Sequence, residues 1–187
     1  MSTLTLALRQ DRRVALLGAL GFVAALAAAS QVAIPLPGTP VPFTLQPLLV
    51  VLAGMMLGPT MGAVSMALYL VLGAMGLPVF APIGAPGIAR FVGPTGGYLI
   101  AYPAAAWVAG TLATRAPTLL RRWLAATAGV AVLYVGGIGQ LTLLTGSVTR
   151  AIALGVTPFA LLDVAKAFVA ARMTWWERAI RSDATDV

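Results

Sequence analysis

Residues 161–169 of the chain read Leu-Leu-Asp-Val-Ala-Lys-Ala-Phe-Val, which places one acid and one base inside an otherwise apolar run. Asp163 and Lys166 are three residues apart, and side chains with this spacing lie on the same face of a helix. A charged side chain in a membrane span costs a few kcal/mol on insertion scales, so such residues tend to face a protein interior or a cavity. The stretch therefore predicts a membrane helix whose charges pair with each other, hold a ligand, or do both.

The composition is that of an integral membrane protein. Apolar residues make up 60% of the chain and charged residues only 9%, against about 25% charged residues in soluble domains. The apolar runs are continuous rather than alternating, which favours helices over a transmembrane barrel. The chain has no cysteine and no histidine, which excludes disulfides, thiolate chemistry and histidine metal sites. We expect no metal site.

Six apolar runs predict six transmembrane helices in a single integral membrane domain that covers residues 1–187. The second run is short for a full span, which predicts a tilted or partly buried helix. The first run ends in a small-residue stretch that could also be a signal-peptidase site, but we expect it to be retained because its length is that of a span. The glycines at 136, 137 and 139 are expected to allow close helix approach. The predicted spans are at about 14–32, 45–57, 61–77, 98–112, 123–144 and 157–175.

The basic residues predict the orientation of these spans. The chain carries a net charge of +7, and its basic clusters lie between apolar runs, as orientation signals do, so we expect no nucleic-acid binding. With six spans, three clusters fall on one side, which the positive-inside rule makes cytoplasmic, together with both termini. This predicts a multi-pass protein of the cell inner (cytoplasmic) membrane. The clusters are Arg9, Arg12 and Arg13; Arg115, Arg121 and Arg122; and Arg172, Arg178 and Arg181.

Two unusual loops are expected on the outer side. Residues 34–44 contain four prolines within eight residues, which predicts a stiff, non-helical loop. The loop is either a plain connector or, because so apolar a segment is not expected to lie free in water, a lid or a lining. Residues 78–98 form a long Gly- and Pro-rich excursion with a single charge, Arg90. A loop longer than about 12–15 residues is usually functional or disordered, and its hydrophobicity argues against disorder. Asp163 and Lys166 fall in the outer half of the last span, so we expect Arg90 to converge with them beneath the proline loop.

These three charges suit a small ligand. If Asp163 pairs with Lys166, the positive charge of Arg90 is available to a ligand that carries one carboxylate. Arginine binds a carboxylate through two parallel hydrogen bonds, whereas lysine binds it as a point charge. Asp163 could instead accept N–H bonds from a neutral polar ring. The alternative is an internal salt bridge with a solvated Arg90. Nothing resembles a nucleophile with its base and no Walker motif occurs, so we expect neither catalysis nor ATP hydrolysis in this chain.

A small-residue pair marks the first span. Ala15 and Ala19, with Gly18 between them, form an Ala-x-x-x-Ala pattern that lets another helix approach closely. The pattern fits a partner subunit, or ordinary packing within the chain.

Several motifs resemble the biotin-specific BioY family. They are residues 31–46 (QVAIPLPGTPVPFTLQ), 76–81 (GLPVFA) and 93–99 (GPTGGYL), together with the Asp163-x-x-Lys166 pair. The resemblance covers essentially the whole chain. It implies an S-component-like helical bundle that acts as the high-affinity biotin-binding (S) subunit of an energy-coupling factor (ECF) importer. Such a subunit captures biotin from the outer side and works with a transmembrane coupling subunit and two ATPase subunits.

The resemblance also implies roles for individual residues. Lys166 and Arg90 would engage the carboxylate of biotin, and Asp163 its ureido N–H groups. Ala15 and Ala19 would contact the coupling subunit. ATP would be hydrolysed by the partners, so no cofactor is implied for this chain, and a homo-oligomer is left open. The alternative function is a self-sufficient secondary carrier for a small carboxylate, driven by protons through Asp163, for which clear inverted repeats would be expected. The other implied substrate-binding residues are Tyr98, Phe43, Thr44 and Gln46.

Overall fold

The structure, a computed structural model, describes the backbone of residues 3–185 and the side chains of residues 13–175. Every regular element of the described chain is helical, and its one strand-like feature is an isolated antiparallel bridge between Ile34 and Phe43. The α-helices are α1 (Thr3–Gln31), α2 (Gln46–Leu57), α3 (Pro59–Ala74), α4 (Gly96–Thr114), α5 (Leu119–Thr145), α6 (Val148–Gly155) and α7 (Ala160–Thr185), and η1 (Gly87–Val92) is a 3-10 helix.

All six expected helices are present, as α1 to α5 and α7, and the described chain adds α6 where we expected a connector. α6 and α7 are bent by 55° relative to each other across a short break. α3 ends three residues earlier than expected, because Gly76 turns the chain with a φ of +95°, a conformation that favours glycine.

By length and composition, two helical segments of the described chain qualify as membrane spans, Arg13–Gln31 and Leu119–Thr145, or three when α6 and α7 count as one bent span.

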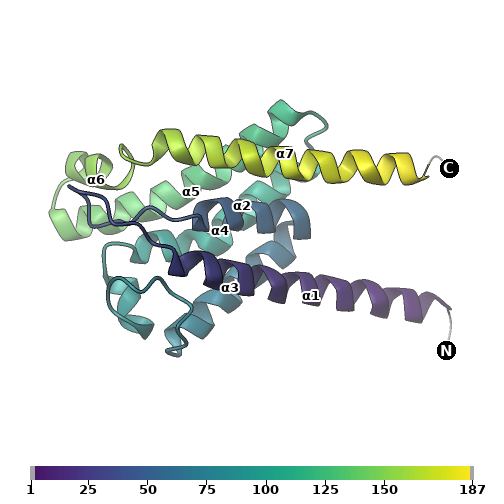
Figure 1. Ribbon diagram of the computed structural model, residues 1–187, viewed down its shortest axis with the longest axis horizontal. Coiled ribbons are helices and arrows are strands. Elements are labelled where there is room, and N and C mark those ends of the chain that lie inside the picture. Colours follow the sequence, from purple (N-terminus) through teal and green to yellow (C-terminus); the bar gives the residue numbers. More distant parts are fainter. Residues whose placement is uncertain (1–2, 186–187) are drawn as a thin grey trace.

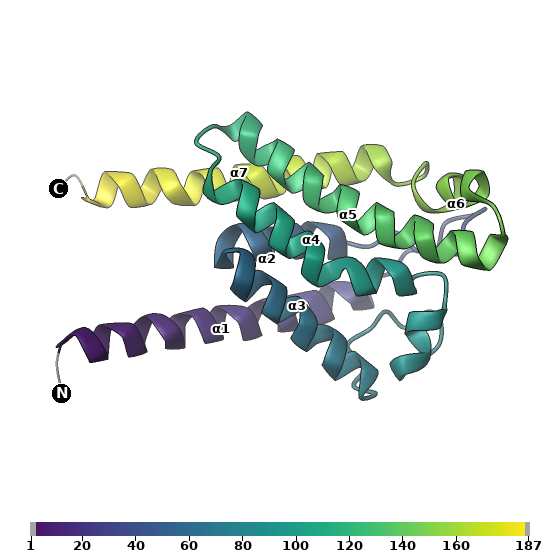
Figure 2. The same ribbon diagram turned by 180° about the vertical axis from the view of Figure 1, so that it is seen from behind.

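The helices form an elongated bundle in which α1 and α7 lie on opposite sides of α2 and α4, while α3 crosses α1 and α5 runs beside α7 (Figures 1 and 2). α4 is central, since it packs against α2, α3 and α5. α1 begins and α7 ends at the same end of the molecule. The proline loop, the long excursion and α6 gather at the opposite end. The two unusual loops are therefore neighbours in space, as the sequence predicted.

Glycines allow the central helices to approach closely. A Cβ atom added at Gly97 of α4 would collide with the backbone of Gly136 in α5, and one added at Gly136 would collide with the backbone of Gly97. A Cβ atom at Gly137 would overlap the ring of Tyr98. The predicted close approach at these glycines is confirmed, and it makes room for an aromatic side chain. Gly139 has open space around it instead.

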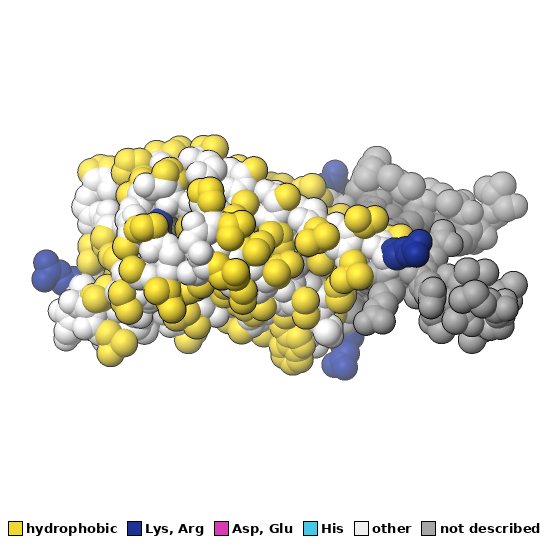
Figure 3. Space-filling view, turned by 90° about the horizontal axis from the view of Figure 1, so that it is seen from below, with side chains coloured by type: hydrophobic (Ala, Val, Ile, Leu, Met, Phe, Trp, Pro, Cys, Tyr) yellow, Lys and Arg dark blue, Asp and Glu magenta, His cyan; other side chains and the backbone are white. Residues whose placement is uncertain are grey.

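The surface between the two ends of the molecule is largely apolar. In the face that Figure 3 shows, hydrophobic side chains are spread over the described part of the molecule, and Lys and Arg lie mainly at one end of this part and beside the residues drawn in grey. Large side chains on several helices point outward, with exposed fractions of 69% for Leu17, 53% for Val71, 58% for Ile100 and 73% for Val135. A soluble monomer rarely exposes so extended an apolar surface. The arrangement is that of a helical membrane protein surrounded by lipid.

Candidate ligand-binding site

A pocket opens at the end of the bundle where the loops gather. Its empty space, with the open mouth included, is about 720 Å³. Parts of the chain far apart in sequence contribute walls: the proline loop with the start of α2, the excursion, α4, α5, the end of α6 and the start of α7. The lining residues are Val41, Pro42, Thr44, Gln46, Pro47, Phe80, Ala81, Arg90, Thr95, Tyr98, Leu99, Tyr102, Leu133, Tyr134, Gly155, Phe159, Asp163 and Lys166.

The predicted ion pair is present and borders this pocket. Lys166 Nζ donates to Asp163 Oδ1 over 2.8 Å, between residues three apart on α7. Both residues are buried, with exposed fractions of 4% for Asp163 and 9% for Lys166. Asp163 lies in the first turn of α7, just after the break that separates α6 from α7. The break therefore places the acid at the start of α7, where it lines the pocket.

The last residues of the proline loop contact the ammonium group of Lys166. Lys166 Nζ also donates to the carbonyl oxygen of Thr44 over 2.7 Å and lies 3.9 Å from the ring centroid of Phe43. Phe43 is held in turn by two backbone hydrogen bonds to Ile34, which close the loop at its base. At the tip, the Thr39 hydroxyl donates to the carbonyl of Leu154 in α6 over 2.6 Å. Phe43 and Thr44 thus belong to the site, with Phe43 behind the ammonium group instead of on the pocket wall.

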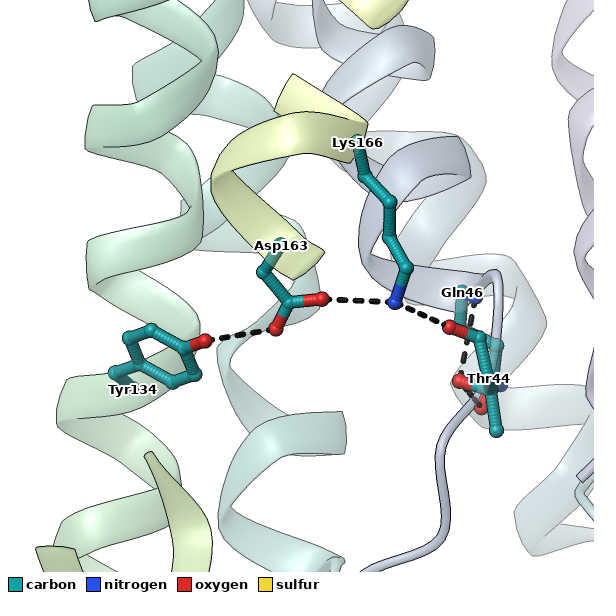
Figure 4. A network of polar contacts seen from close by, with 5 residues as sticks. All are labelled: Thr44, Gln46, Tyr134, Asp163 and Lys166. Carbon is teal, nitrogen blue, oxygen red and sulfur yellow. Dashed lines mark hydrogen bonds and ion pairs between the residues drawn. The ribbon is translucent and has the colours of Figure 1, made fainter. Parts of the chain in front are cut away.

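Tyr134 is a site residue that the sequence reasoning missed. Its hydroxyl donates to Asp163 Oδ2 over 2.8 Å, opposite the side where Lys166 binds the carboxylate (Figure 4). The residue lies on α5 within the apolar run 123–144, where it is the one tyrosine. A phenol in a membrane span needs a hydrogen-bond partner, and this requirement was the available signal.

Gln46 and Tyr98 line the pocket, and both polar groups are already bonded within the protein. Gln46 Nε2 donates to the Tyr69 hydroxyl over 2.9 Å, and Tyr69 donates to the carbonyl of Val79 in the excursion, also over 2.9 Å. The Tyr98 hydroxyl donates to the carbonyl of Gly155 over 2.7 Å. Tyr98 thereby bonds to a backbone group at the break between α6 and α7.

Arg90 lines the pocket but is far from solvated, so the alternative of a solvated Arg90 is wrong. The residue is 6% exposed, and its guanidinium donates to the carbonyl oxygens of Ile83 and Ala81 in its own loop. Among the described residues, its buried Nε has no hydrogen-bond partner. Burial lowers the pKa of the guanidinium from its ordinary value, but arginine starts so high that the group remains a cation. Arg90 therefore brings a positive charge to the pocket and also shapes the excursion.

Trp123 lies beside the turn of α7 that carries the ion pair. Its indole N–H donates to the carbonyl of Val164 over 3.0 Å, and its ring packs edge-on against Phe168 of α7. Trp123 thus contacts the turn that carries both charges.

The pair proposed as a partner contact on α1 is partly covered by the chain itself. Ala19 is 4% exposed, and Ala15 is half-buried. A Cβ atom at Gly18 would lie 2.8 Å from Leu57 Cδ2 at the end of α2. Ala19 therefore packs within the chain in this structure. The role of Ala15 and Ala19 as a contact for the coupling subunit stays a prediction.

Known proteins match nearly the whole chain. The family model of the BioY family matches residues 4–181. A probable biotin transporter BioY of Pyrococcus horikoshii is 41% identical over 149 residues, which are 80% of this chain and 86% of that protein. The biotin transporter BioY of Thermotoga maritima is 39% identical over 150 residues, 80% of this chain and 87% of that protein.

The fold has a counterpart among solved structures. A crystal structure of the S-component for biotin from an ECF-type ABC transporter has a TM-score of 0.83 at 24% identity, and the match covers 96% of this chain and 95% of the other. The two proteins share their fold. The sequence matches show that the chain belongs to the BioY family.

Proposed function

We propose that this chain is the biotin-binding S-component of an ECF-type importer and captures biotin from the outer side of the cytoplasmic membrane. The observation that carries the proposal is the buried pair of Asp163 and Lys166, which borders a mostly apolar pocket beside a second buried cation, Arg90. Small-molecule sites combine apolar walls with a few convergent polar groups. Biotin has the matching parts: an apolar ring and chain, a polar cyclic urea and one carboxylate.

The contact between the two charges refines the roles that the resemblance implied. Lys166 Nζ and Asp163 Oδ1 are 2.8 Å apart, so both face the same part of a bound molecule. Extended biotin separates its ureido ring from its carboxylate by the sulfur-containing ring and the valerate chain. The ureido ring presents N–H donors beside a carbonyl acceptor, which complements a carboxylate beside an ammonium group. We assign the ureido ring to Asp163 and Lys166, and the carboxylate to Arg90.

This assignment is tested by comparing biotin with biotin methyl ester on two variants. Arg90→Met should weaken biotin by about tenfold or more, as expected for a lost charge-assisted bond, and should remove the preference for biotin over its ester. Lys166→Met should weaken both ligands by a similar factor and keep the preference. If Lys166→Met lost the preference for biotin over its ester, Lys166 and not Arg90 would be the residue that binds the carboxylate of biotin. The test compares the ratio of the two affinities, because Arg90 also donates hydrogen bonds to carbonyl groups of its own loop. Arg90→Met therefore changes the shape of the pocket for both ligands as well as its charge.

We further propose six membrane-spanning segments with both termini in the cytoplasm. α6 and α7 would form the sixth as a bent span, and α2 and α3 would cross as short helices within the bundle. The shared end of α1 and α7, and the basic clusters predicted there, support this orientation. Arg9, Arg12, Arg178 and Arg181 belong to those clusters, and their side chains lie outside the described residues. The pocket would then open to the outside.

Transport would require a coupling subunit and ATPases. α1 is the natural contact for them because it is less covered by the rest of the chain than α5 is. In the most apolar part of Arg13–Gln31, 22% of the residues are buried, against 39% in that of Leu119–Thr145. Its open side carries the small residues Gly21, Ala24, Ala25 and Ala28, which allow close helix approach.

Uptake in a host without its own biotin transporter tests this dependence. Uptake should require coexpressed coupling and ATPase subunits and should persist when the proton gradient is collapsed while ATP is maintained. Uptake by the chain alone that stops when the proton gradient is collapsed would identify a secondary carrier instead.

A further inference from the structure

The carboxylate of Asp163 is held from two sides. Lys166 donates to Oδ1 and Tyr134 to Oδ2, each over 2.8 Å, so each oxygen has one donor (Figure 4). The donors come from different helices, Lys166 from α7 and Tyr134 from α5. All three residues line the pocket.

The hydrogen bond from Tyr134 fixes the orientation of the Asp163 carboxylate, which the bond from Lys166 alone leaves free to rotate. The terminal torsion of an aspartate is broad, so a carboxylate held at one oxygen can rotate about that bond. A hydrogen bond from Tyr134 to the other oxygen defines the plane of the carboxylate. The remaining lone pairs of Asp163 then have a fixed direction relative to the pocket.

The same bond also fixes the hydrogen-bonding character of Tyr134. A phenol has one proton to donate and lone pairs to accept with, whereas an ionised carboxylate only accepts. The proton of Tyr134 is committed to Asp163, so the phenol oxygen offers the pocket acceptors alone. On this wall, Asp163 and Tyr134 are therefore adjacent acceptors and favour a ligand that brings N–H donors.

We propose that Tyr134 is a positioning residue that orients Asp163 and thereby sets the preference of the site for ligands with unsubstituted ring N–H groups. The inference rests on the proposed function, because biotin supplies such donors in its ureido ring. It adds a residue on α5 whose contribution acts through Asp163.

The test is calorimetric titration of the full-length protein in detergent, with wild type and Tyr134→Phe. The ligands are biotin, dethiobiotin, which keeps both ureido N–H groups, and the two biotin analogues that carry a methyl group on one ureido nitrogen. Tyr134→Phe removes one oxygen and keeps the ring, and an unchanged melting midpoint would establish that the fold is intact. We expect about tenfold or more weaker binding of biotin and dethiobiotin, and a loss of less than about threefold for at least one methylated analogue.

Two further variants separate positioning from a general effect on the pocket. Tyr98→Phe is the matched tyrosine variant, because Tyr98 lines the same pocket but bonds to the carbonyl of Gly155. It should change the affinities for all four ligands by a common factor. In an Asp163→Asn background, Tyr134→Phe should have less than about a threefold further effect, because the group that it orients has changed.

The possible results separate a failure of the proposed function from a failure of the positioning role of Tyr134. A folded wild type that does not bind biotin would overturn the proposed function. A wild type that binds biotin, with a Tyr134→Phe variant that loses the same factor for every ligand or loses nothing, would overturn the positioning role alone. A full additive effect of Tyr134→Phe in the Asp163→Asn background would do the same.

Discussion

At the scale of single residues, the buried charges are costly features whose retention needs a reason. Removing two charges from water carries a desolvation penalty, and replacing a buried ion pair with apolar residues is often neutral or stabilising, whereas removing one partner is strongly destabilising. Asp163 and Lys166 therefore contribute little net stability as a pair. Their position on the pocket wall supplies the reason, since both can bind a ligand.

Variants at the two buried charges should show a specific pattern of stability. Lys166→Met alone and Asp163→Leu alone should each destabilise the fold by about 3–5 kcal/mol, because each leaves one buried charge unpaired. The double variant should be more stable than either single variant, although all three should bind biotin more weakly than the wild type. Chemical unfolding in detergent micelles would measure this. A double variant whose destabilisation equals the sum of the two single ones would contradict the account.

Part of the site could be predicted at this scale and part could not. The spacing of Asp163 and Lys166 predicted their pairing, because helix geometry is local. Arg90 was expected to converge with them, but its bonds to Ala81 and Ile83 were not foreseen, since backbone carbonyls in a loop leave no pattern in the sequence. Tyr134 was missed because its partner lies 29 residues away on another helix.

At the scale of elements, the packing of α4 on α5 depends on glycines that have no room for a side chain. Gly136→Ala should destabilise the protein by about 1–3 kcal/mol, the usual effect of overpacking, because its Cβ would meet the backbone of α4. Gly139→Ala is the matched control on the same helix, where a Cβ meets open space, and should stabilise by up to about 1 kcal/mol. Equal melting midpoints for the two variants would show that the close approach is unimportant.

A second prediction at this scale concerns the open side of α1. Gly21→Leu should leave the binding of biotin unchanged, because a Cβ there meets nothing within 4 Å. It should reduce uptake in the presence of the partner subunits several-fold or more, since the larger side chain blocks close approach of another helix. Gly139→Leu, at a glycine of α5 that also has open space, is the control and should retain uptake. Normal uptake by Gly21→Leu would remove α1 as the coupling surface.

The helices themselves were largely predictable, because continuous apolar runs are a strong local signal. α6 was missed, since Val148–Gly155 is short and carries Arg150, and it resembled a connector between two spans. The bend between α6 and α7 depends on contacts such as that of Tyr98 with Gly155. Those contacts join residues distant in sequence.

At the scale of the whole molecule, the orientation can be tested because the chain has no cysteine. A single Arg150→Cys substitution in α6 should react with a membrane-impermeant maleimide in intact cells. A single Arg115→Cys substitution between α4 and α5 should react only after the membrane is permeabilised. Both sites are exposed, so differences in labelling report the side of the membrane. The reverse pattern would invert the proposed topology and would place the pocket opening in the cytoplasm.

Calorimetric titration of the purified, detergent-solubilised protein measures whether the pocket with its buried ion pair binds biotin. We expect saturable binding of biotin by the wild type, weaker binding of biotin methyl ester, and no detectable binding by a folded Lys166→Met, Asp163→Leu variant. A folded wild type that binds neither ligand would contradict this expectation. Full affinity in the double variant would also contradict it, because the ion pair would then have no part in binding.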